Sequence, residues 1–298
     1  MEDISLGDVC DLLIKLARQA GELMLAADPG SSTATVDTKQ NTADLVTETD
    51  KAIENSIRSA LAEAYPSIAF LGEETHQQGQ QLTLAPVFIV DPIDGTTNFI
   101  HGYPHVCVSL ALVANRESQV GVVYNPFLDQ LYTAIKGQGS FLTTGSRRLR
   151  LPLRGAGAQP LKDLSTCVVA AEWGYDRRGQ NFEIKKGVFA KLAAAREDGG
   201  KMVHALRAMG SATLNMCAVA AGQQDVYWEG GAWVWDVAAA YCILKEAGGL
   251  IAGGNPGDWD APIDGRKYLA VRPASSGQED IVKEFWSVMG DQKMEYNS

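Results

Sequence analysis

The sequence predicts an α/β protein of the α+β kind, and three observations agree on this fold class. The chain has 298 residues, of which 46% are hydrophobic and 21% are charged, as is typical of a folded globular protein. Two amphipathic helical patterns precede a run of strands in the first half. In the second half, strands alternate with helices, which indicates a layered arrangement. We therefore expect one compact unit with an N-terminal half at 1–150 and a C-terminal half at 151–298.

The first half is expected to hold two helices followed by a strand meander. The helix at 5–26 has apolar residues at helical spacing, and the pattern Thr47-x-x-Asp50 caps a second helix at 50–64. Short apolar runs separated by turn residues then predict strands. These strands are expected at 68–71, 87–90, 106–114, 120–124 and 130–135.

The second half changes rhythm after a stretch rich in Gly, Pro and Arg at 145–160, which is the expected seam between the halves. Strands are expected at 167–171, 202–206, 225–228, 250–252 and 268–271. Helices are expected at 183–196, 211–221, 236–247 and 279–289.

Charge and cysteine content exclude several classes of protein. The net charge is −10, which argues against general binding to nucleic acid or to an anionic membrane, because both need a basic surface. The five cysteines form no Cys-x-x-Cys pair, so we expect reduced, buried thiols. No apolar run approaches the ~18 residues of a membrane span, and no targeting segment is visible. The expected location is the cytoplasm.

The segment Val87–Phe99 carries the clearest chemical signal. An apolar strand ends at Asp91, and a second carboxylate follows at Asp94, so the two converge on one point. Gly95 would let the backbone approach a ligand closely, and Thr96 adds a hydroxyl. Hard cations such as Mg²⁺ prefer such oxygen ligands. An Asx turn with a hydroxyl cap is the alternative, but the whole block at a strand end favours a metal site.

Three further acidic segments have more than one interpretation. Glu73 ends an apolar strand, but a solvated charged turn would look the same. The segment Asp44–Asp50 could serve chemistry or simply cap a helix. Asp236 begins a long apolar helix after two tryptophans, and an N-cap is the commonest role for such an aspartate.

Taken together, these segments resemble the inositol monophosphatase family of Mg²⁺-dependent, lithium-sensitive phosphatases, over roughly residues 5–285. The resemblance is carried by Asp44-Leu-Val-Thr-Glu-Thr-Asp50, Gly72-Glu73-Glu74, Asp91-Pro-Ile-Asp94-Gly-Thr96-Thr97-Asn98-Phe99, Trp235-Asp236-Val-Ala-Ala-Ala and Glu246-Ala-Gly-Gly249. It implies a layered α-β-α-β-α sandwich, two to three Mg²⁺ ions and a homodimer.

The resemblance also implies roles for individual residues. Glu73, Asp91 and the carbonyl of Ile93 correspond to ligands of a first Mg²⁺, while Asp91, Asp94 and Asp236 correspond to ligands of a second. Glu73 would also face a third, weaker ion and is counted with the catalytic residues.

The remaining roles concern water and substrate. Asp50 and Thr96 correspond to the pair that orients and deprotonates the attacking water, and Lys39 to a basic residue near the metals. For Ser211, a helix N-cap is an equally good interpretation. The substrate contacts fall on Asp94, Gly95, Thr96, Gly210, Ser211, Ala212, Glu229 and Asp236.

The implied function is Mg²⁺-dependent hydrolysis of a small polyol phosphate, with myo-inositol monophosphate as the favoured substrate. A site built only of carboxylates would repel a phosphate dianion, and bound cations reverse the local charge. The alternatives are a 3′,5′-bisphosphate nucleotidase, a fructose-1,6-bisphosphatase, a histidinol phosphatase or an inactive regulatory homologue. The complete set of expected metal ligands argues against the inactive homologue, and Glu229, seven residues before Asp236, favours the inositol branch.

Overall fold

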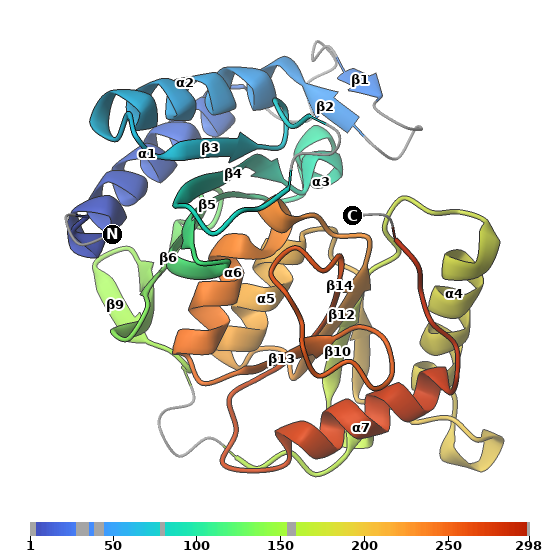
Figure 1. Ribbon diagram of the computed structural model, residues 1–298. Helices are drawn as coiled ribbons and strands as arrows, with labels where there is room; N and C mark the ends of the chain where they lie inside the picture. The colour runs from blue at the N-terminus through green and yellow to red at the C-terminus, as the bar shows by residue number, and fades with distance from the viewer. Residues whose placement is uncertain (1–3, 28–35, 39–44, 78–80, 154–158, 297–298) are drawn as a thin grey trace.

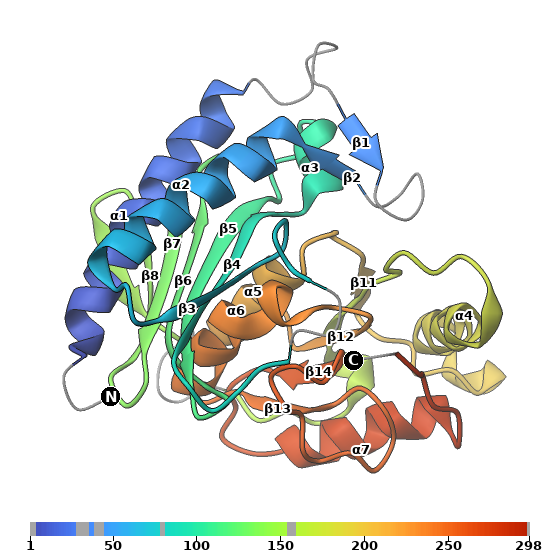
Figure 2. The same ribbon diagram turned by 45° about the horizontal axis from the view of Figure 1, so that its top comes forward.

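Helices and sheets alternate in five layers, as Figures 1 and 2 show. The computed structural model describes residues 4–27, 36–38, 45–77, 81–153 and 159–296. One helix pair covers a seven-stranded sheet, a second pair fills the space between this sheet and a five-stranded one, and a third pair covers the far side. The expected α-β-α-β-α sandwich is confirmed.

The larger sheet has its strands in sequence order. Its first two strands pair in parallel and all later neighbours are antiparallel. The meander was expected to begin with the strand at 68–71, but it begins with the next strand, at residue 87. The strands are β3 (Ala69–Gly72), β4 (Val87–Asp94), β5 (Cys107–Ala114), β6 (Glu117–Asn125), β7 (Gln130–Ile135), β8 (Gly139–Thr144) and β9 (Arg147–Arg150).

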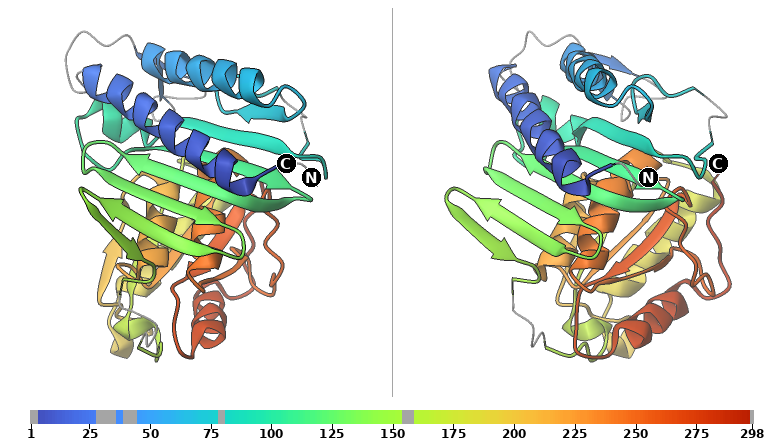
Figure 3. Two further views of the ribbon diagram at one scale, coloured as in Figure 1. Left: turned by 90° about the vertical axis from the view of Figure 1, so that its left-hand side faces the viewer. Right: turned by 60° about the vertical axis from the view of Figure 1, so that its left-hand side comes forward.

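Helices α1 (Leu6–Ala26) and α2 (Glu48–Ala64) lie across the outer face of this sheet, as Figure 3 shows. Their apolar stripes form one core with the sheet, in which Leu13 of α1 and Ile53 of α2 are fully buried. Both helices were predicted, and α2 begins two residues earlier than expected. A short antiparallel pair, β1 (Val36–Thr38) and β2 (Leu45–Thr47), was not predicted.

The central layer consists of α5 (Ala212–Ala221) and α6 (Val234–Glu246), which are apolar on nearly every side because both sheets enclose them. Helix α6 approaches β6 so closely that a Cβ on Gly121 would lie 2.2 Å from the carbonyl oxygen of Ala239. The hydroxyl of Ser118 also donates to the carbonyl of Ala238 at 2.8 Å. The backbone of α6 is therefore fixed against the sheet.

The smaller sheet has the order β11-β10-β12-β14-β13. Its strands are β10 (Val168–Ala171), β11 (Ala205–Arg207), β12 (Val226–Gly230), β13 (Leu250–Gly253) and β14 (Lys267–Val271). Helices α4 (Gly179–Ala193) and α7 (Gln278–Met289) cover its outer face, together with 3-10 turns at Leu164–Thr166 and Arg196–Asp198. Strands β10, β11 and β12 are parallel, and β14 is antiparallel to both of its neighbours.

Several predicted boundaries were wrong. Helix α4 covers 179–193 rather than 183–196, because Ala194 and Ala195 adopt extended backbone and end it. Helix α6 begins at Val234 rather than at Asp236. Strands β8 and β9 were missed, and β9 lies inside the stretch expected to be a seam. The division into halves at residue 150 stays a prediction.

Two further predictions concern the whole chain. All five cysteines are free and buried, as expected. Within the residues described above, every helix is too short or too polar to cross a lipid bilayer.

Candidate active site

Strand β4 brings the first two carboxylates to one point. It continues four residues beyond its predicted end at residue 90, and its pairing with β5 shifts register between Asp91 and Asp94. Such an irregularity lets side chains that would otherwise alternate in direction reach the same side. The backbone N–H of Ile93 donates to Asp91 Oδ1 at 3.0 Å, which fixes the turn.

Helix α6 supplies the third carboxylate. Oxygen atoms of Asp91, Asp94 and Asp236 all lie within 4.8 Å of one another. Asp236 stands in the first turn of α6, and its Oδ2 accepts a hydrogen bond from the N–H of Trp233 at 2.6 Å. Asp236 therefore caps the helix from its third position, and its carboxylate also faces the cluster, so the capping role and the cluster role coexist.

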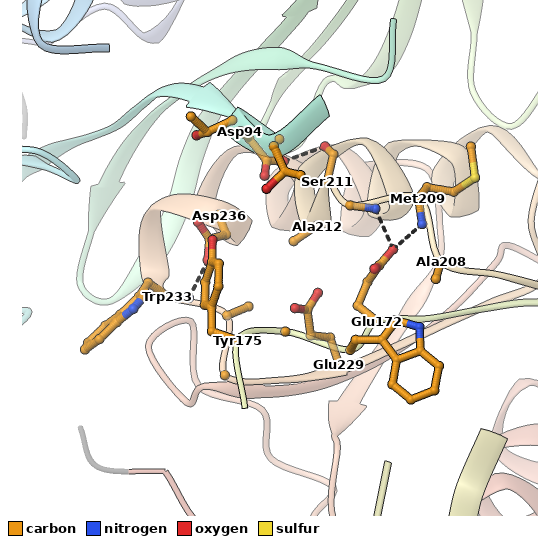
Figure 4. A pocket seen from close by; sticks show the side chains of 18 of the residues that line it. Asp94, Glu172, Tyr175, Ala208, Met209, Ser211, Ala212, Glu229, Trp233 and Asp236 are labelled. Carbon is orange, nitrogen blue, oxygen red and sulfur yellow. Dashed lines mark hydrogen bonds between the residues drawn. The ribbon is translucent and has the colours of Figure 1, made fainter. Parts of the chain in front are cut away.

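Asp94 is held from the start of α5, as Figure 4 shows. Its Oδ2 accepts hydrogen bonds from the Ser211 hydroxyl at 2.6 Å and from the N–H of Thr213 at 2.8 Å. The Ser211 hydroxyl oxygen also accepts from the N–H of Leu214 at 3.1 Å. The N-cap interpretation of Ser211 is thus confirmed. Its hydroxyl group also donates its one hydrogen bond to Asp94.

Glu73 comes from the turn after β3, and α2 fixes this turn. Glu54 Oε2 accepts a hydrogen bond from the N–H of Glu74 at 2.7 Å. A Cβ at Gly72 would lie 2.4 Å from the Glu54 carboxyl group, so the glycine is what lets Glu54 reach the turn. Burial raises the pKa of Glu54. Sequence reasoning did not single out this carboxyl group.

The electrostatics of the cluster fit a divalent cation. Burial, followed by the charge of Glu73, raises the pKa of Asp91 well above its usual range. Burial, followed by Asp94, does the same for Asp236, and burial raises the pKa of Asp94 to about 6. Buried carboxylates that repel one another need a compensating positive charge. An all-oxygen donor set is the one that Mg²⁺ prefers.

Asp50 and Thr96 lie together beside this cluster. The Thr96 hydroxyl is 3.4 Å from Asp50 Oδ1 and 3.0 Å from the carbonyl oxygen of Ile93. Thr96 opens the short helix α3 (Thr96–Ile100), and Gly95 before it has φ +93°. A Cβ on Gly95 would lie 2.9 Å from the carbonyl oxygen of His105, so glycine is needed there on two grounds.

The opposite wall of the pocket carries Glu229, at the end of β12 (Figure 4). Its Oε2 accepts a hydrogen bond from the Tyr227 hydroxyl at 2.5 Å. Burial, followed by the charge of Glu172, raises the pKa of Glu229 to about 8. Lys185 of α4 opposes this shift, and its ammonium group donates to the carbonyl of Gly230 at 2.6 Å.

Sequence reasoning missed Glu172, which organises the loop before α5. Its Oε1 accepts hydrogen bonds from the N–H groups of Met209 at 2.6 Å and Gly210 at 3.0 Å, and from Asn215 Nδ2 at 2.8 Å. Asn98, quoted within the motif but given no role, donates to the carbonyl oxygen of Met209 at 2.7 Å. The signal for Glu172 was available, because it too is an acid directly after an apolar strand.

The acidic cluster, Glu172 and Glu229 line one cavity of about 640 Å³, a size suited to a small-molecule ligand. Asp50 lies behind Thr96 rather than on the cavity wall and is 1% exposed. Lys39 and Asp44 lie outside the described residues. The predicted residues that line the cavity are Glu73, Asp91, Ile93, Asp94, Gly95, Thr96, Gly210, Ser211, Ala212, Glu229 and Asp236.

Comparisons with known proteins agree with this geometry. Inositol monophosphatase 2 of Saccharomyces cerevisiae is 44% identical over 287 residues, covering 94% of this chain and 94% of that protein. Protein qutG of Emericella nidulans is 40% identical and covers 91% of this chain and 90% of its own. The crystal structure of the extragenic suppressor protein suhB from Bartonella henselae superimposes with a TM-score of 0.76 at 28% identity, covering 95% of this chain and 98% of that one.

The sequence pattern described as the inositol monophosphatase family matches residues 6–289. This match covers nearly the whole chain, and the expected acidic cluster lies within it. The family consists of metal-dependent phosphoric monoester hydrolases that act on small phosphorylated substrates. By sequence, fold and site, the chain belongs to the inositol monophosphatase family.

Proposed function

We propose that this protein hydrolyses myo-inositol monophosphate to inositol and phosphate with two to three Mg²⁺ ions. One observation carries the proposal: a buried cluster of carboxylates stands on one wall of a cavity of about 640 Å³, and Glu229 stands on the opposite wall. The first wall suits a cation and a phosphate, and the second suits the hydroxyl groups of a polyol.

The residues that would hold the ions are all at the cluster. Glu73, Asp91 and the carbonyl of Ile93 would hold one ion, and Asp91, Asp94 and Asp236 a second. When bound, magnesium supplies the positive charge that lowers the pKa of a nearby water and offsets charge on the leaving oxygen.

The Asp50–Thr96 pair is placed to orient the attacking water. The Thr96 hydroxyl can donate to Asp50 and accept from a water, which would direct the lone pair of the water toward phosphorus. Asp50 is the proton acceptor reached through Thr96. The loop 210–212 and Glu229 would then hold the alcohol part of the substrate. The reaction needs no covalent intermediate on a side chain.

The test is a phosphate-release screen with Mg²⁺ over inositol monophosphates, histidinol phosphate, fructose 1,6-bisphosphate and 3′,5′-bisphosphate nucleotides. We expect the highest kcat/KM for an inositol monophosphate. A higher value for one of the other compounds would identify the corresponding alternative activity. No release from any of them would favour an inactive regulatory homologue and overturn the proposal.

We also propose a homodimer located in the cytoplasm. The resemblance to the family supports the dimer, and the five free buried cysteines support a reducing compartment. Light scattering on the purified protein would measure the mass in solution, and a mass of about 32 kDa, that of one chain, would contradict the dimer.

Replacing Glu229 with Gln is expected to change substrate choice more than metal binding. In assays above its pKa of about 8 the Glu229 side chain is charged. Gln keeps the shape of the side chain but removes that charge, and a hydrogen bond to a charged group contributes about 1.5–3 kcal/mol. We therefore expect KM for an inositol phosphate to rise ~10-fold or more, and KM for a simple ester such as phenyl phosphate to rise less. Steady-state kinetics on both substrates measure this difference. Equal losses on the two would make Glu229 a structural residue.

Lithium is expected to inhibit hydrolysis at concentrations on the order of millimolar, uncompetitively or noncompetitively with substrate. Li⁺ is a hard cation close in size to Mg²⁺, so it suits the oxygen donors of Asp91, Asp94 and Asp236. It has half the charge, so the leaving oxygen and the phosphate product would be stabilised differently. Phosphate release at fixed Mg²⁺ is measured with rising Li⁺, and Na⁺ at equal ionic strength is the control. Identical effects of the two ions up to tens of millimolar would rule out the second metal site as described.

A further inference from the structure

After α7 the chain turns back beside α4, as Figures 1 and 2 show, and residues 293–296 end at Tyr296, which lines the substrate cavity. We call residues 293–296 the strap. Asn255 holds it from one side: the N–H of Met294 donates to Asn255 Oδ1 at 2.9 Å, and Asn255 Nδ2 donates to the Met294 carbonyl at 2.9 Å. The Met294 side chain is 1% exposed. The strap is therefore packed into the protein rather than lying loosely on it.

Helix α4 holds the strap from the other side. The N–H of Glu295 donates to Asn181 Oδ1 at 3.0 Å, and Asn181 Nδ2 donates to the Glu295 carbonyl at 2.7 Å. Two asparagines thus bind two consecutive strap residues through both backbone groups. A reciprocal pair of this kind fixes the direction of the backbone, and with it the direction of the next side chain, Tyr296.

The Tyr296 ring lines the same cavity as Glu229 and Asp236. It packs on the backbone directly after Glu229, where a Cβ on Gly230 would lie 2.7 Å from a ring carbon. A Cβ on Gly231 would lie 3.1 Å from the ring, and this residue also has φ +106°. The space that two side chains would occupy is filled instead by the tyrosine ring and, at Gly230, also by the end of the Met294 side chain at 2.7 Å.

Neighbouring charged groups affect both the position of the Tyr296 ring and the protonation of its hydroxyl. The Arg266 guanidinium carbon and the Lys185 ammonium nitrogen each lie 5.7 Å from the ring centre, within reach of a cation–π attraction. Burial, followed by the nearby carboxylate of Asp176, raises the pKa of Tyr296, so its hydroxyl stays protonated at neutral pH. The ring is thus a rigid, uncharged surface beside the carboxylate that faces the substrate.

We propose that Tyr296 is a specificity-determining residue, whose ring forms the wall that limits the size of the alcohol part of the substrate. This inference rests on the proposed function, since it assigns the alcohol to the side of the cavity near Glu229. A flat ring fits the carbon face of a polyol, and it occupies the space that a bulkier alcohol such as a nucleoside would need. Shape selection of this kind discriminates by ~10- to 200-fold per group excluded.

The test compares the unchanged protein with Tyr296→Ala on three substrates: inositol 1-phosphate, glycerol 2-phosphate and adenosine 2′-monophosphate. The ratio of kcat/KM for the nucleotide to kcat/KM for inositol 1-phosphate should rise ~10-fold. The change should lie in KM, and glycerol 2-phosphate should keep its kcat, because it is too small to reach the wall. Tyr296→Phe is the matched control and should keep the ratio of the unchanged protein.

An unchanged ratio in Tyr296→Ala would overturn the proposal, and so would an equal loss on all three substrates, which would mark a purely structural ring. If Tyr296→Ala does not fold, Asn181→Ala decides, because it releases Glu295 without touching the cavity. In Asn181→Ala the ratio of kcat/KM for the nucleotide to kcat/KM for inositol 1-phosphate should also rise, and an unchanged ratio would overturn the proposal.

Failure of the proposed function is distinguishable from failure of this inference. If the proposed function is wrong, the unchanged protein would release phosphate from none of the three compounds. Dissociation constants measured by calorimetry need no turnover, and the same change in their ratio would still support the wall. No change in that ratio would overturn it.

Discussion

Replacing Asp91 with Asn should lower kcat by ~1000-fold or more, because several kcal/mol of transition-state stabilisation depend on the cations that this residue is proposed to hold. Asp91 is 1% exposed and lies at the centre of the acidic cluster. It is also the residue proposed to contact two ions at once, so no neighbouring carboxylate can take its place. Phosphate release on the purified variant measures the loss.

The same substitution should leave the metal-free protein as stable as the parent or more stable. Burial and the charges of Glu73, Asp94 and Asp236 all raise the pKa of Asp91, so its ionisation opposes folding. Asparagine removes that charge and keeps the shape. Urea unfolding in the presence of a chelator compares the two proteins. Near-normal Mg²⁺-dependent activity in a folded variant would contradict the assignment of the site.

Replacing Gly121 with Ala should destabilise the protein by about 3 kcal/mol, at the upper end of the cost of overpacking a core. The added Cβ would lie 2.2 Å from the carbonyl oxygen of Ala239 and 3.1 Å from the Cβ of Cys242. A backbone atom cannot move aside as the end of a flexible side chain can. Helix α6 would have to lift from β6, which moves Asp236 away from Asp91, so activity should fall as well.

A matched control for this variant is Gly187→Ala. Gly187 lies in α4 with nothing near its missing Cβ, so alanine there should stabilise the protein by about 0.5–1 kcal/mol. Urea unfolding measures the free energy of unfolding, which should fall in Gly121→Ala and rise in Gly187→Ala. If Gly121→Ala proved as stable as the parent, the close packing of α6 on β6 would be wrong.

The acidic residues of the site were predictable because each stands where an apolar element begins or ends. Asp91 and Glu73 directly follow apolar runs of sequence, and Asp236 stands in the first turn of a helix, so local pattern alone isolates them. Local sequence pattern cannot tell which of these residues lie close together in space. That Asp236 would lie beside Asp91, across 145 residues of chain, entered through the family resemblance and is now given by the packing of α6.

The elements that were missed lack the signals on which sequence reasoning depends. Strand β9 has arginine at three of its four positions, with no alternation of apolar and polar residues, because it is an exposed edge strand. Helix α4 begins four residues early, where no side chain caps it and its first three residues, Gly179, Gln180 and Asn181, carry no apolar side chain. Glu172 is different, because it directly follows an apolar strand as an acid would be expected to do at a site. Its role could not be predicted because the groups that it binds, at Met209, Gly210 and Asn215, lie far along the chain.

The carboxylates of the cluster come from β4 and from α6, and this division has a consequence for how the protein folds. Contacts between distant parts of a chain form late, since a long loop must close before they contribute stability. The last step of folding should therefore be the one that brings like charges together, and it should be the slow one at neutral pH without divalent ions. Refolding should accelerate with Mg²⁺ if the ions enter before α6 has docked on the larger sheet, and only unfolding should slow if they enter afterwards.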